Sequence, residues 1–229
     1  MAPYLLSLNP SYQRQMDELQ YTLLSDGPTD KALMPILTWL LQQHIPNLPI
    51  QPRWADLRRL PRPPKELREK IRESIHLFPC DLLFIHRDAE NTSLDDRINE
   101  IRNAVIDANV DDAISNIICV VPVRMTEAWL LFDSDAIRQA AGNPNGTVPL
   151  QLPRPSDIEN LPDPKRILRK ALLIATEYGT RRRRRFDVNR AVQRVPECIE
   201  DFSPLRRLLA FIALEEEIKR IVDSQNWSS

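Results

Sequence analysis

The sequence predicts an α/β fold in which a mainly parallel sheet is flanked by helices. The first observation is a pair of short apolar runs, at residues 81–86 and 117–123, that lack the alternation of a half-exposed strand. Such runs are typical of strands buried on both faces, as in a parallel sheet. The second observation is that segments with helical periodicity separate the expected strands. Strands that alternate with helices run parallel and are joined by right-handed crossovers.

The first elements can be placed from their patterns. Residues 19–25 form the expected first strand, and an apolar face at helical spacing follows, made of Leu33, Ile36, Leu37, Leu40 and Leu41. Thr29 is the expected N-cap of that helix, and Pro35 should kink the helix or delay its start. Residues 50–55 form a short strand near the sheet edge, because a proline interrupts it.

The remaining elements of the domain follow the same alternation. A charged helix opens at Pro63 and Pro64 and runs to about His76, before the strand at 81–86. A helix with apolar positions from 94 to 106 then leads to the strand at 117–123. Residues 127–131 and 134–141 are short helical pieces, and Gly142 suits a C-terminal cap.

Three regions are expected along the chain. Residues 19–142 form the α/β domain, and residues 143–163 form a proline-rich linker or lid without periodicity. Residues 164–229 form a helical extension packed on the domain, with helices at 164–177, 187–195 and 204–225. The arginine run at 181–185 follows a glycine and is expected to lie in a loop.

Composition narrows the class of protein. The chain has 229 residues, a formal net charge of −1 and three cysteines without metal-ligand spacing. No apolar run reaches the length that spans a membrane, so we expect a cytoplasmic protein without a membrane partner. Proteins that bind nucleic acid over a wide surface are often strongly basic. Nucleic-acid contact would therefore come from a local patch, such as residues 181–185.

Acidic residues follow two of the expected strands. Asp26 comes directly after the first strand, and Asp88 and Glu90 follow the strand at 81–86. The carboxyl ends of parallel strands share one sheet edge, where ligands bind. Side chains two apart in an extended segment face the same way, so Asp88 and Glu90 are expected to face one Mg²⁺ or Mn²⁺ ion that Asp26 also reaches. Gly27 would let the backbone turn sharply and approach a phosphate.

A plainer interpretation remains open for each acid. A single acidic residue after a strand is usually a helix cap or a solvated turn residue. Asp30 is expected to be such a residue, placed in the first helical turn. Glu127 has the same alternative, because a carboxylate near the start of a helix is favoured by the helix dipole.

These motifs resemble the TOPRIM superfamily, a Rossmannoid fold found in topoisomerases, bacterial primases and nucleases of the OLD type. The superfamily pattern is an acid followed by glycine after the first strand, and Asp-x-Asp after a later strand. Asp26-Gly27 and Asp88-Ala89-Glu90 match it here. The run Thr-Glu-Ala-Trp-Leu-Leu-Phe-Asp at 126–133 is similar to a family of prokaryotic TOPRIM-like proteins of this length. The resemblance covers about residues 19–142.

The resemblance implies a magnesium-dependent nuclease that cleaves phosphodiester bonds in DNA or RNA. Asp88 and Glu90 would hold one or two Mg²⁺ ions, or Mn²⁺ ions. Asp26 would orient or deprotonate the attacking water or serve as a further ligand, and Glu127 would be a fourth acidic group. Members of the family resemble companions of ABC-type or SMC-like ATPases, in a setting of defence against mobile elements.

Two positions depart from the superfamily pattern. Asp26 stands where most TOPRIM proteins carry Glu, and Glu90 stands where they carry Asp. Both keep the charge, but the shorter arm of Asp26 would weaken proton transfer more than metal binding. A second interpretation is therefore a TOPRIM-like binding subunit that does not cleave. A third, a magnesium phosphotransferase or nucleotidyltransferase, lacks the glycine-rich phosphate loop that such enzymes use.

Several basic residues are weaker candidates for phosphate contact. Lys31 and Arg87 lie beside the acidic turns, and Arg181, Arg182 and Arg183 begin the arginine run. Each is equally compatible with a solvated surface position. His86 also lies near the expected site, but no histidine has zinc-ligand spacing.

Overall fold

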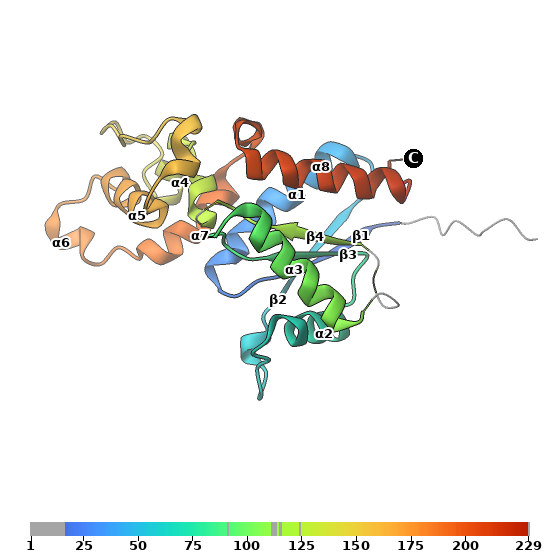
Figure 1. Cartoon of the computed structure of the whole chain (residues 1–229). Helices are drawn as coiled ribbons and strands as arrows, with labels where there is room; N and C mark the ends of the chain where they lie inside the picture. Colours follow the sequence, from blue (N-terminus) through green and yellow to red (C-terminus); the bar gives the residue numbers. More distant parts are fainter. Residues whose placement is uncertain (1–16, 91, 111–113, 115, 124, 229) are drawn as a thin grey trace, which may run out of the picture.

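The computed structural model describes residues 17–228 apart from 91, 111–113, 115 and 124, and it contains a four-stranded parallel sheet (Figure 1). The strand order is β2-β1-β3-β4, with parallel pairing throughout. The strands are β1 (Leu19–Leu24), β2 (Ile50–Ala55), β3 (Leu82–His86) and β4 (Ile117–Val120). The predicted α/β class and the edge position of the strand at 50–55 are confirmed.

Helices cover both faces of the sheet and extend beyond one edge of it. The α-helices are α1 (Leu33–His44), α2 (Leu67–Leu77), α3 (Leu94–Ala108), α4 (Ser134–Ala140), α5 (Pro164–Ala175), α6 (Thr180–Arg183), α7 (Val188–Cys198) and α8 (Leu209–Ser224). The 3₁₀ turns are η1 (Thr29–Ala32), η2 (Leu57–Arg59), η3 (Thr126–Leu130), η4 (Pro155–Asn160) and η5 (Ser203–Arg207). Within the described residues, no helix combines the length and apolar character needed to cross a bilayer.

The central strand β3 explains the two-sided core. All five of its residues are buried, and successive side chains point to opposite faces. Phe84 therefore packs in the core beneath α1 and α8, where its ring meets Tyr21 edge to face at 5.3 Å. Leu83 and Ile85 pack in the second core, beneath α2 and α3. Burying each of these side chains contributes about 2 kcal/mol, so both helical layers hold the sheet.

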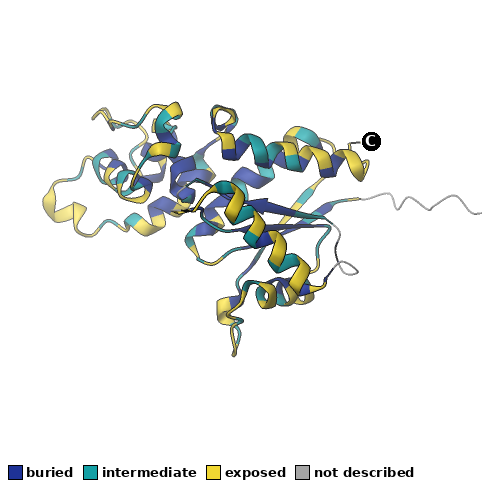
Figure 2. Ribbon diagram, viewed as in Figure 1, coloured by how far each residue is buried: buried dark blue, intermediate teal, exposed yellow. Residues whose placement is uncertain are grey.

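The C-terminal extension shares the core of the sheet. Trp129 of η3 is fully buried and packs against Phe211 of α8, with ring centroids 5.4 Å apart. Leu150 and Ile158, from the proline-rich segment, are buried in the same core as α5, α7 and α8. Figure 2 shows this continuity as dark blue running from the sheet into the extension, whereas α6 is exposed. The extension therefore packs on one face of the sheet through α8, and α5 lies beside η3, which follows β4.

Several boundaries differ from the prediction for identifiable reasons. Helix α2 begins at Leu67, after Pro63 and Pro64, because Glu66 and Glu69 form a capping box there. Strand β4 stops at Val120, two residues before Pro122, which has no N–H to donate. Helix α1 begins at Leu33, as the delay expected from Pro35 requires.

Other local expectations need correction. Thr29 does not cap the first helical segment, because Pro28 occupies the N-cap of η1. The run at 181–185 was expected in a loop, but its first three residues belong to the single helical turn of α6. The single helix expected at 204–225 is divided into η5 and α8, with Leu208 between them in an extended conformation. Gly142 has the expected left-handed conformation after α4, with φ of 76°.

Candidate functional site

A polar cavity of about 270 Å³ lies at the carboxyl edge of the sheet, beyond β1 and β3. Turns after the two strands supply most of its walls, as expected for an open parallel sheet. Its lining residues are Asp26, Gly27, Asp30, His86, Arg87, Asp88, Glu90 and Arg97. The structure thus brings together three acids that the sequence predicted, Asp26, Asp88 and Glu90, and adds Asp30 and His86.

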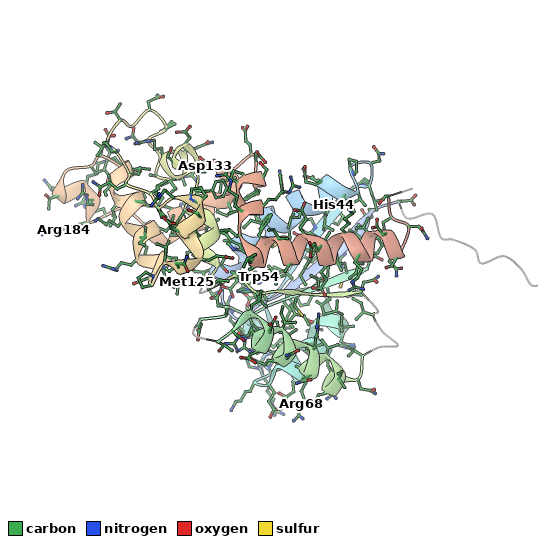
Figure 3. All side chains as sticks on the ribbon, turned by 45° about the horizontal axis from the view of Figure 1, so that its top comes forward. His44, Trp54, Arg68, Met125, Asp133 and Arg184 are labelled. Carbon is green, nitrogen blue, oxygen red and sulfur yellow. The ribbon has the colours of Figure 1, made fainter. Side chains whose placement is uncertain are left out.

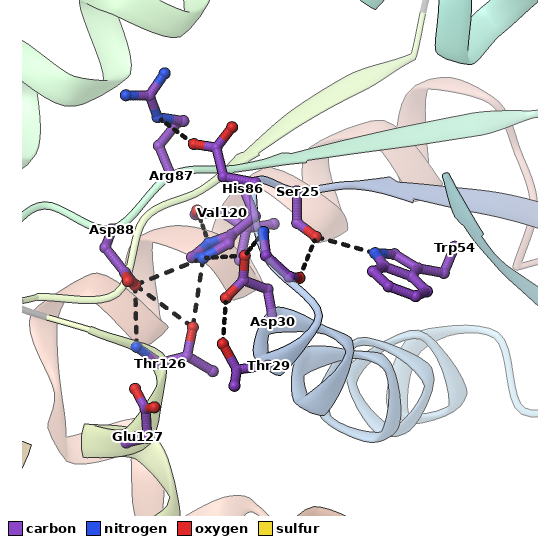
Figure 4. Close-up of polar contacts among 12 residues, drawn as sticks. Ser25, Thr29, Asp30, Trp54, His86, Arg87, Asp88, Val120, Thr126 and Glu127 are labelled. Atoms are coloured by element: carbon purple, nitrogen blue, oxygen red, sulfur yellow. Dashed lines mark hydrogen bonds and ion pairs between the residues drawn. The ribbon is translucent and has the colours of Figure 1, made fainter. Parts of the chain in front are cut away.

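His86 organises the interior of this cavity (Figure 4). Its side chain is 2% exposed, and Nδ1 lies 3.0 Å from the carbonyl oxygen of Val120. A carbonyl oxygen only accepts, so Nδ1 carries the proton and donates this bond. Nε2 then faces two carboxylates, lying 3.5 Å from Asp88 Oδ1 and 3.9 Å from Asp30 Oδ2. We call these three residues, Asp30, His86 and Asp88, the His86 cluster.

Asp88 is held in a partly buried position by the start of η3. Its Oδ1 accepts the Thr126 backbone N–H at 3.0 Å and the Thr126 hydroxyl at 3.4 Å. Burial raises the pKa of Asp88 to about 6; His86 opposes the rise, and the carboxylates of Asp30 and Glu127 add to it. The negative charge of Asp88 is therefore only partly compensated within the protein.

Asp30 belongs to the site although the sequence predicted only a turn residue. Asp30 does lie in the first turn after β1, in η1, but it is buried there, with only 8% of its surface exposed. Its Oδ2 accepts the Gly27 backbone N–H at 2.8 Å, which draws the carboxylate back toward the sheet edge and His86. The three-residue spacing from Gly27 is typical of such a capping bond and could have indicated this orientation.

The Asp26 carboxylate is paired with two basic side chains. Its Oδ1 accepts from Lys70 Nζ at 2.6 Å, and its Oδ2 lies 3.1 Å from Arg87 Nε. We call these contacts the Asp26 ion pairs. Lys70 projects from α2, and Arg87 also reaches Glu100 of α3 at 3.2 Å. Asp26 lines the cavity, but it does not belong to the His86 cluster. The carboxylates within 4 Å of His86 Nε2 are those of Asp30 and Asp88.

Gly27 does not supply the conformational freedom that was expected. All four glycines lie within the described residues, and Gly142 alone among them has a positive φ. The turn at Gly27 therefore uses an ordinary backbone conformation. A Cβ added at Gly27 would meet Asp30 Oδ2 at 3.4 Å, an ordinary contact. The expected sharp turn that requires glycine is therefore wrong.

The two glutamates reach the site in different ways. Glu90 is exposed and has a left-handed φ of 52°, so the extended segment expected to align it with Asp88 is wrong. It nevertheless lines the cavity. The Glu127 side chain is 8% exposed in η3, close enough to Asp88 to raise the pKa of that carboxyl, and lies 3.8 Å from Lys165 Nζ of α5.

The weaker candidates are dispersed. Lys31 lines a separate groove of about 480 Å³ with Trp39 and Phe202, so the structure does not bring it to the acidic cavity. Arg87 does line the cavity. Arg181, Arg182 and Arg183 are exposed on α6, in the extension.

The cavity offers the donor chemistry of a divalent-cation site. Carboxylate oxygens suit Mg²⁺ and Mn²⁺, and a cation would relieve the repulsion of Asp88 by Asp30 and Glu127. Over residues 17–228, apart from the six left out, no three Asp, Glu, His or Cys side chains stand close enough to hold a metal ion. In their chemistry, the carboxylates of Asp30, Asp88 and Glu127 fit such an ion.

Comparisons of the chain with protein-family models, with curated proteins and with solved structures found no match. The TOPRIM resemblance therefore stays a prediction that rests on the short motifs.

Proposed function

We propose that the protein is a nuclease that uses Mg²⁺ or Mn²⁺ to hydrolyse phosphodiester bonds in nucleic acid. The observation that carries the proposal is the crowding of carboxylates at the edge where parallel sheets bind ligands. Asp30 and Asp88 both lie within 4 Å of His86 Nε2, and burial with neighbouring carboxylates raises the pKa of Asp88 to about 6. A bound cation would offset that cost.

The residues of the cavity would divide the chemistry. Asp30 and Asp88 would hold the metal, with Glu127 and Glu90 as further oxygen donors near it. A bound divalent ion supplies Lewis acidity toward a phosphoryl oxygen and lowers the pKa of a water. The bond from His86 Nδ1–H to Val120 fixes the imidazole ring, so Nε2 is held against both aspartates.

The arginine run would bind the nucleic-acid backbone outside the cavity. Arg181 through Arg185 are all exposed, in a chain whose net charge is only −1. Arg182 lies over the Tyr178 ring, 3.9 Å from its centroid, and Tyr178 meets Phe186 edge to face. These contacts anchor the turn against the extension, and Figure 3 shows Arg184 at the outer end of the molecule. Phosphate contacts of this kind carry affinity without sequence preference.

A cleavage assay tests the proposed function. The purified protein would be incubated with plasmid DNA and with tRNA, in Mg²⁺, in Mn²⁺ and in EDTA. We expect cleavage with either metal and none in EDTA. Asp88→Asn should abolish it, whereas Asp95→Asn, an exposed aspartate at the start of α3, should not. Equal cleavage by Asp88→Asn, or no metal-dependent cleavage by the unaltered protein, would contradict the proposal.

A binding subunit without cleavage is the second candidate, and the Asp26 ion pairs favour it. The position that the TOPRIM resemblance assigns to proton transfer is occupied by a carboxylate already paired with two cations. Such a subunit would bind the metal and serve a partner ATPase of the ABC or SMC type. Saturable metal binding in calorimetry, without cleavage in the presence of that partner, would identify it.

The state of the cysteines is informative about the cellular compartment of the protein. Cys80, Cys119 and Cys198 are all free thiols, and burial raises the pKa of Cys119 to about 12. Unpaired, unreactive thiols are typical of proteins in a reducing compartment. They support the proposal that this protein acts in the cytoplasm.

A further inference from the structure

Two cations, Lys70 and Arg87, hold an exposed carboxylate at the mouth of the acidic cavity. Asp26 lies 2.6 Å from Lys70 Nζ and 3.1 Å from Arg87 Nε, with its two oxygens divided between them. The side chain of Asp26 is 46% exposed, while those of Lys70 and Arg87 are 24% and 27% exposed. The carboxylate can therefore leave without uncovering the core, and solvent anions can reach both cations.

We propose that Lys70 and Arg87 form a phosphate subsite, which the Asp26 carboxylate occupies as an internal stand-in until a phosphoryl group displaces it. A carboxylate that bridges two cations has the charge and the oxygen spacing of a phosphate edge. The proposal rests on the proposed function, because it assigns these two side chains to the scissile or the neighbouring phosphate of the substrate.

The cavity wall supports this assignment. Asp26 and Arg87 line the same cavity as Asp30, His86 and Asp88, so a phosphate on Arg87 would sit beside the His86 cluster. Arg87 is fixed from its other side by Glu100, which also pairs with Arg97. Glu100 therefore keeps the guanidinium in place when Asp26 moves away.

Displacement gives Asp26 a conditional role. While it is paired, Asp26 neutralises Lys70 and Arg87 and blocks anion binding. Once a phosphate takes its place, the carboxylate is free to turn toward the cavity that it already lines. Asp26 therefore competes with weakly binding anions for Lys70 and Arg87. Its carboxylate is released toward the cavity only when a phosphate has bound.

The test measures phosphate binding without metal, so it is independent of cleavage. Inorganic phosphate would be titrated into EDTA-treated protein, and the ¹H–¹⁵N signals of the Gly27 amide and of Arg87 Nε would be followed. We expect Asp26→Asn to bind phosphate about 10-fold more tightly than the unaltered protein, because the competing carboxylate is gone. Adding Arg87→Gln or Lys70→Gln to that variant should remove the gain.

Asp56→Asn is the matched control. Asp56 also bridges two arginines, at 2.7 Å to Arg58 and 3.1 Å to Arg59, and its replacement changes the net charge equally. It should leave phosphate affinity at the cavity unchanged. The inference is overturned if Asp26→Asn gains no more than Asp56→Asn, or if phosphate does not shift the Gly27 and Arg87 signals. Nuclease activity can fail or succeed separately, since it is read from metal-dependent cleavage.

Discussion

The two acidic turns at the sheet edge differ in how the charge of their aspartate is compensated. After β1, Asp26 is exposed and its carboxylate is matched by Lys70 and Arg87. After β3, Asp88 is partly buried, and its neighbours include two further carboxylates and His86. If these acidic residues served stability alone, both turns would be expected to pair with cations, because an under-compensated buried charge is costly. This difference is the basis of the two proposals made above, that the His86 cluster binds a ligand and that Asp26 controls access to it.

Substituting one aspartate from each turn gives the largest expected contrast. We predict that Asp30→Asn lowers metal-dependent cleavage by more than about 100-fold, as expected when a group that holds the ion is removed. Asp26→Asn should lower cleavage less, because Asp26 is paired with Lys70 and Arg87 before phosphate binds. Initial rates at saturating Mn²⁺ measure both. An equal decrease in Asp26→Asn and Asp30→Asn would erase the distinction between the two turns.

The pH dependence of stability probes the His86 cluster without a substrate. The pKa of Asp88 is raised from 3.8 to about 6 in the folded protein, so folding favours its protonated form. The stabilisation is fully present below about pH 4 and is lost as the pH rises through about 6. The difference corresponds to at most about 3 kcal/mol.

Urea unfolding in EDTA between pH 4 and pH 7.5 measures this effect. We expect Asp88→Asn to lack the Asp88 contribution, and therefore to be more stable than the unaltered protein at pH 7.5. A parallel decline in both proteins would show that Asp88 carries no such cost.

His86 links the two carboxylates, so its removal should destabilise the protein. We predict that His86→Gln costs about 1–3 kcal/mol of unfolding free energy, since the hydrogen bond to the Val120 carbonyl is broken at a side chain that is 2% exposed. His76→Gln, at an exposed position on α2, is the control and should change little. Chemical denaturation at pH 7 separates the two variants; equal effects would mean that the cluster contributes nothing to stability.

The arginine run should act on affinity alone. Replacing Arg181, Arg183 and Arg184 by Gln is expected to weaken nucleic-acid binding and to lower the salt slope by about 0.7–0.9 for each phosphate that is no longer bound. The control replaces Arg59, Arg62 and Arg68, which are exposed arginines in and before α2; Figure 3 shows Arg68 well away from Arg184. Fluorescence anisotropy at several salt concentrations measures the slopes. Equal weakening in both triple variants would assign the binding to general charge.

The smallest expected effect is at Gly27. Its backbone lacks a positive φ, and a Cβ would make only an ordinary contact with Asp30 Oδ2 at 3.4 Å. Gly27→Ala should therefore change the unfolding free energy by less than about 0.5 kcal/mol. Thermal unfolding of the two proteins is sufficient; a large destabilisation would show that the turn after β1 needs glycine.

The sequence predicted the sheet well because its central strand β3 is buried on both faces. The uninterrupted apolar residues of β3 favoured a strand inside a parallel sheet, and the turns that follow parallel strands share one edge of that sheet. Local signals also predicted the delayed start of α1 near Pro35 and the left-handed conformation of Gly142. These features depend on neighbours within a few residues.

The site was predicted less completely because side-chain direction depends on distant partners. Asp26 is paired by Lys70, which is 44 positions away on α2. Asp30 is directed inward by its bond to Gly27 and by His86 on the neighbouring strand. Glu90 adopts a left-handed conformation that the pattern Asp-x-Glu does not reveal. Motif spacing thus located the edge, and tertiary contacts decided which carboxylates converge.

Isothermal titration calorimetry with Mn²⁺ measures directly whether the acidic cavity binds a divalent cation. We expect one saturable site in the unaltered protein, no such site in Asp88→Asn, and an unchanged site in Asp157→Asn, a half-exposed residue of η4. Absence of saturable binding, or binding that survives in Asp88→Asn, would contradict this expectation.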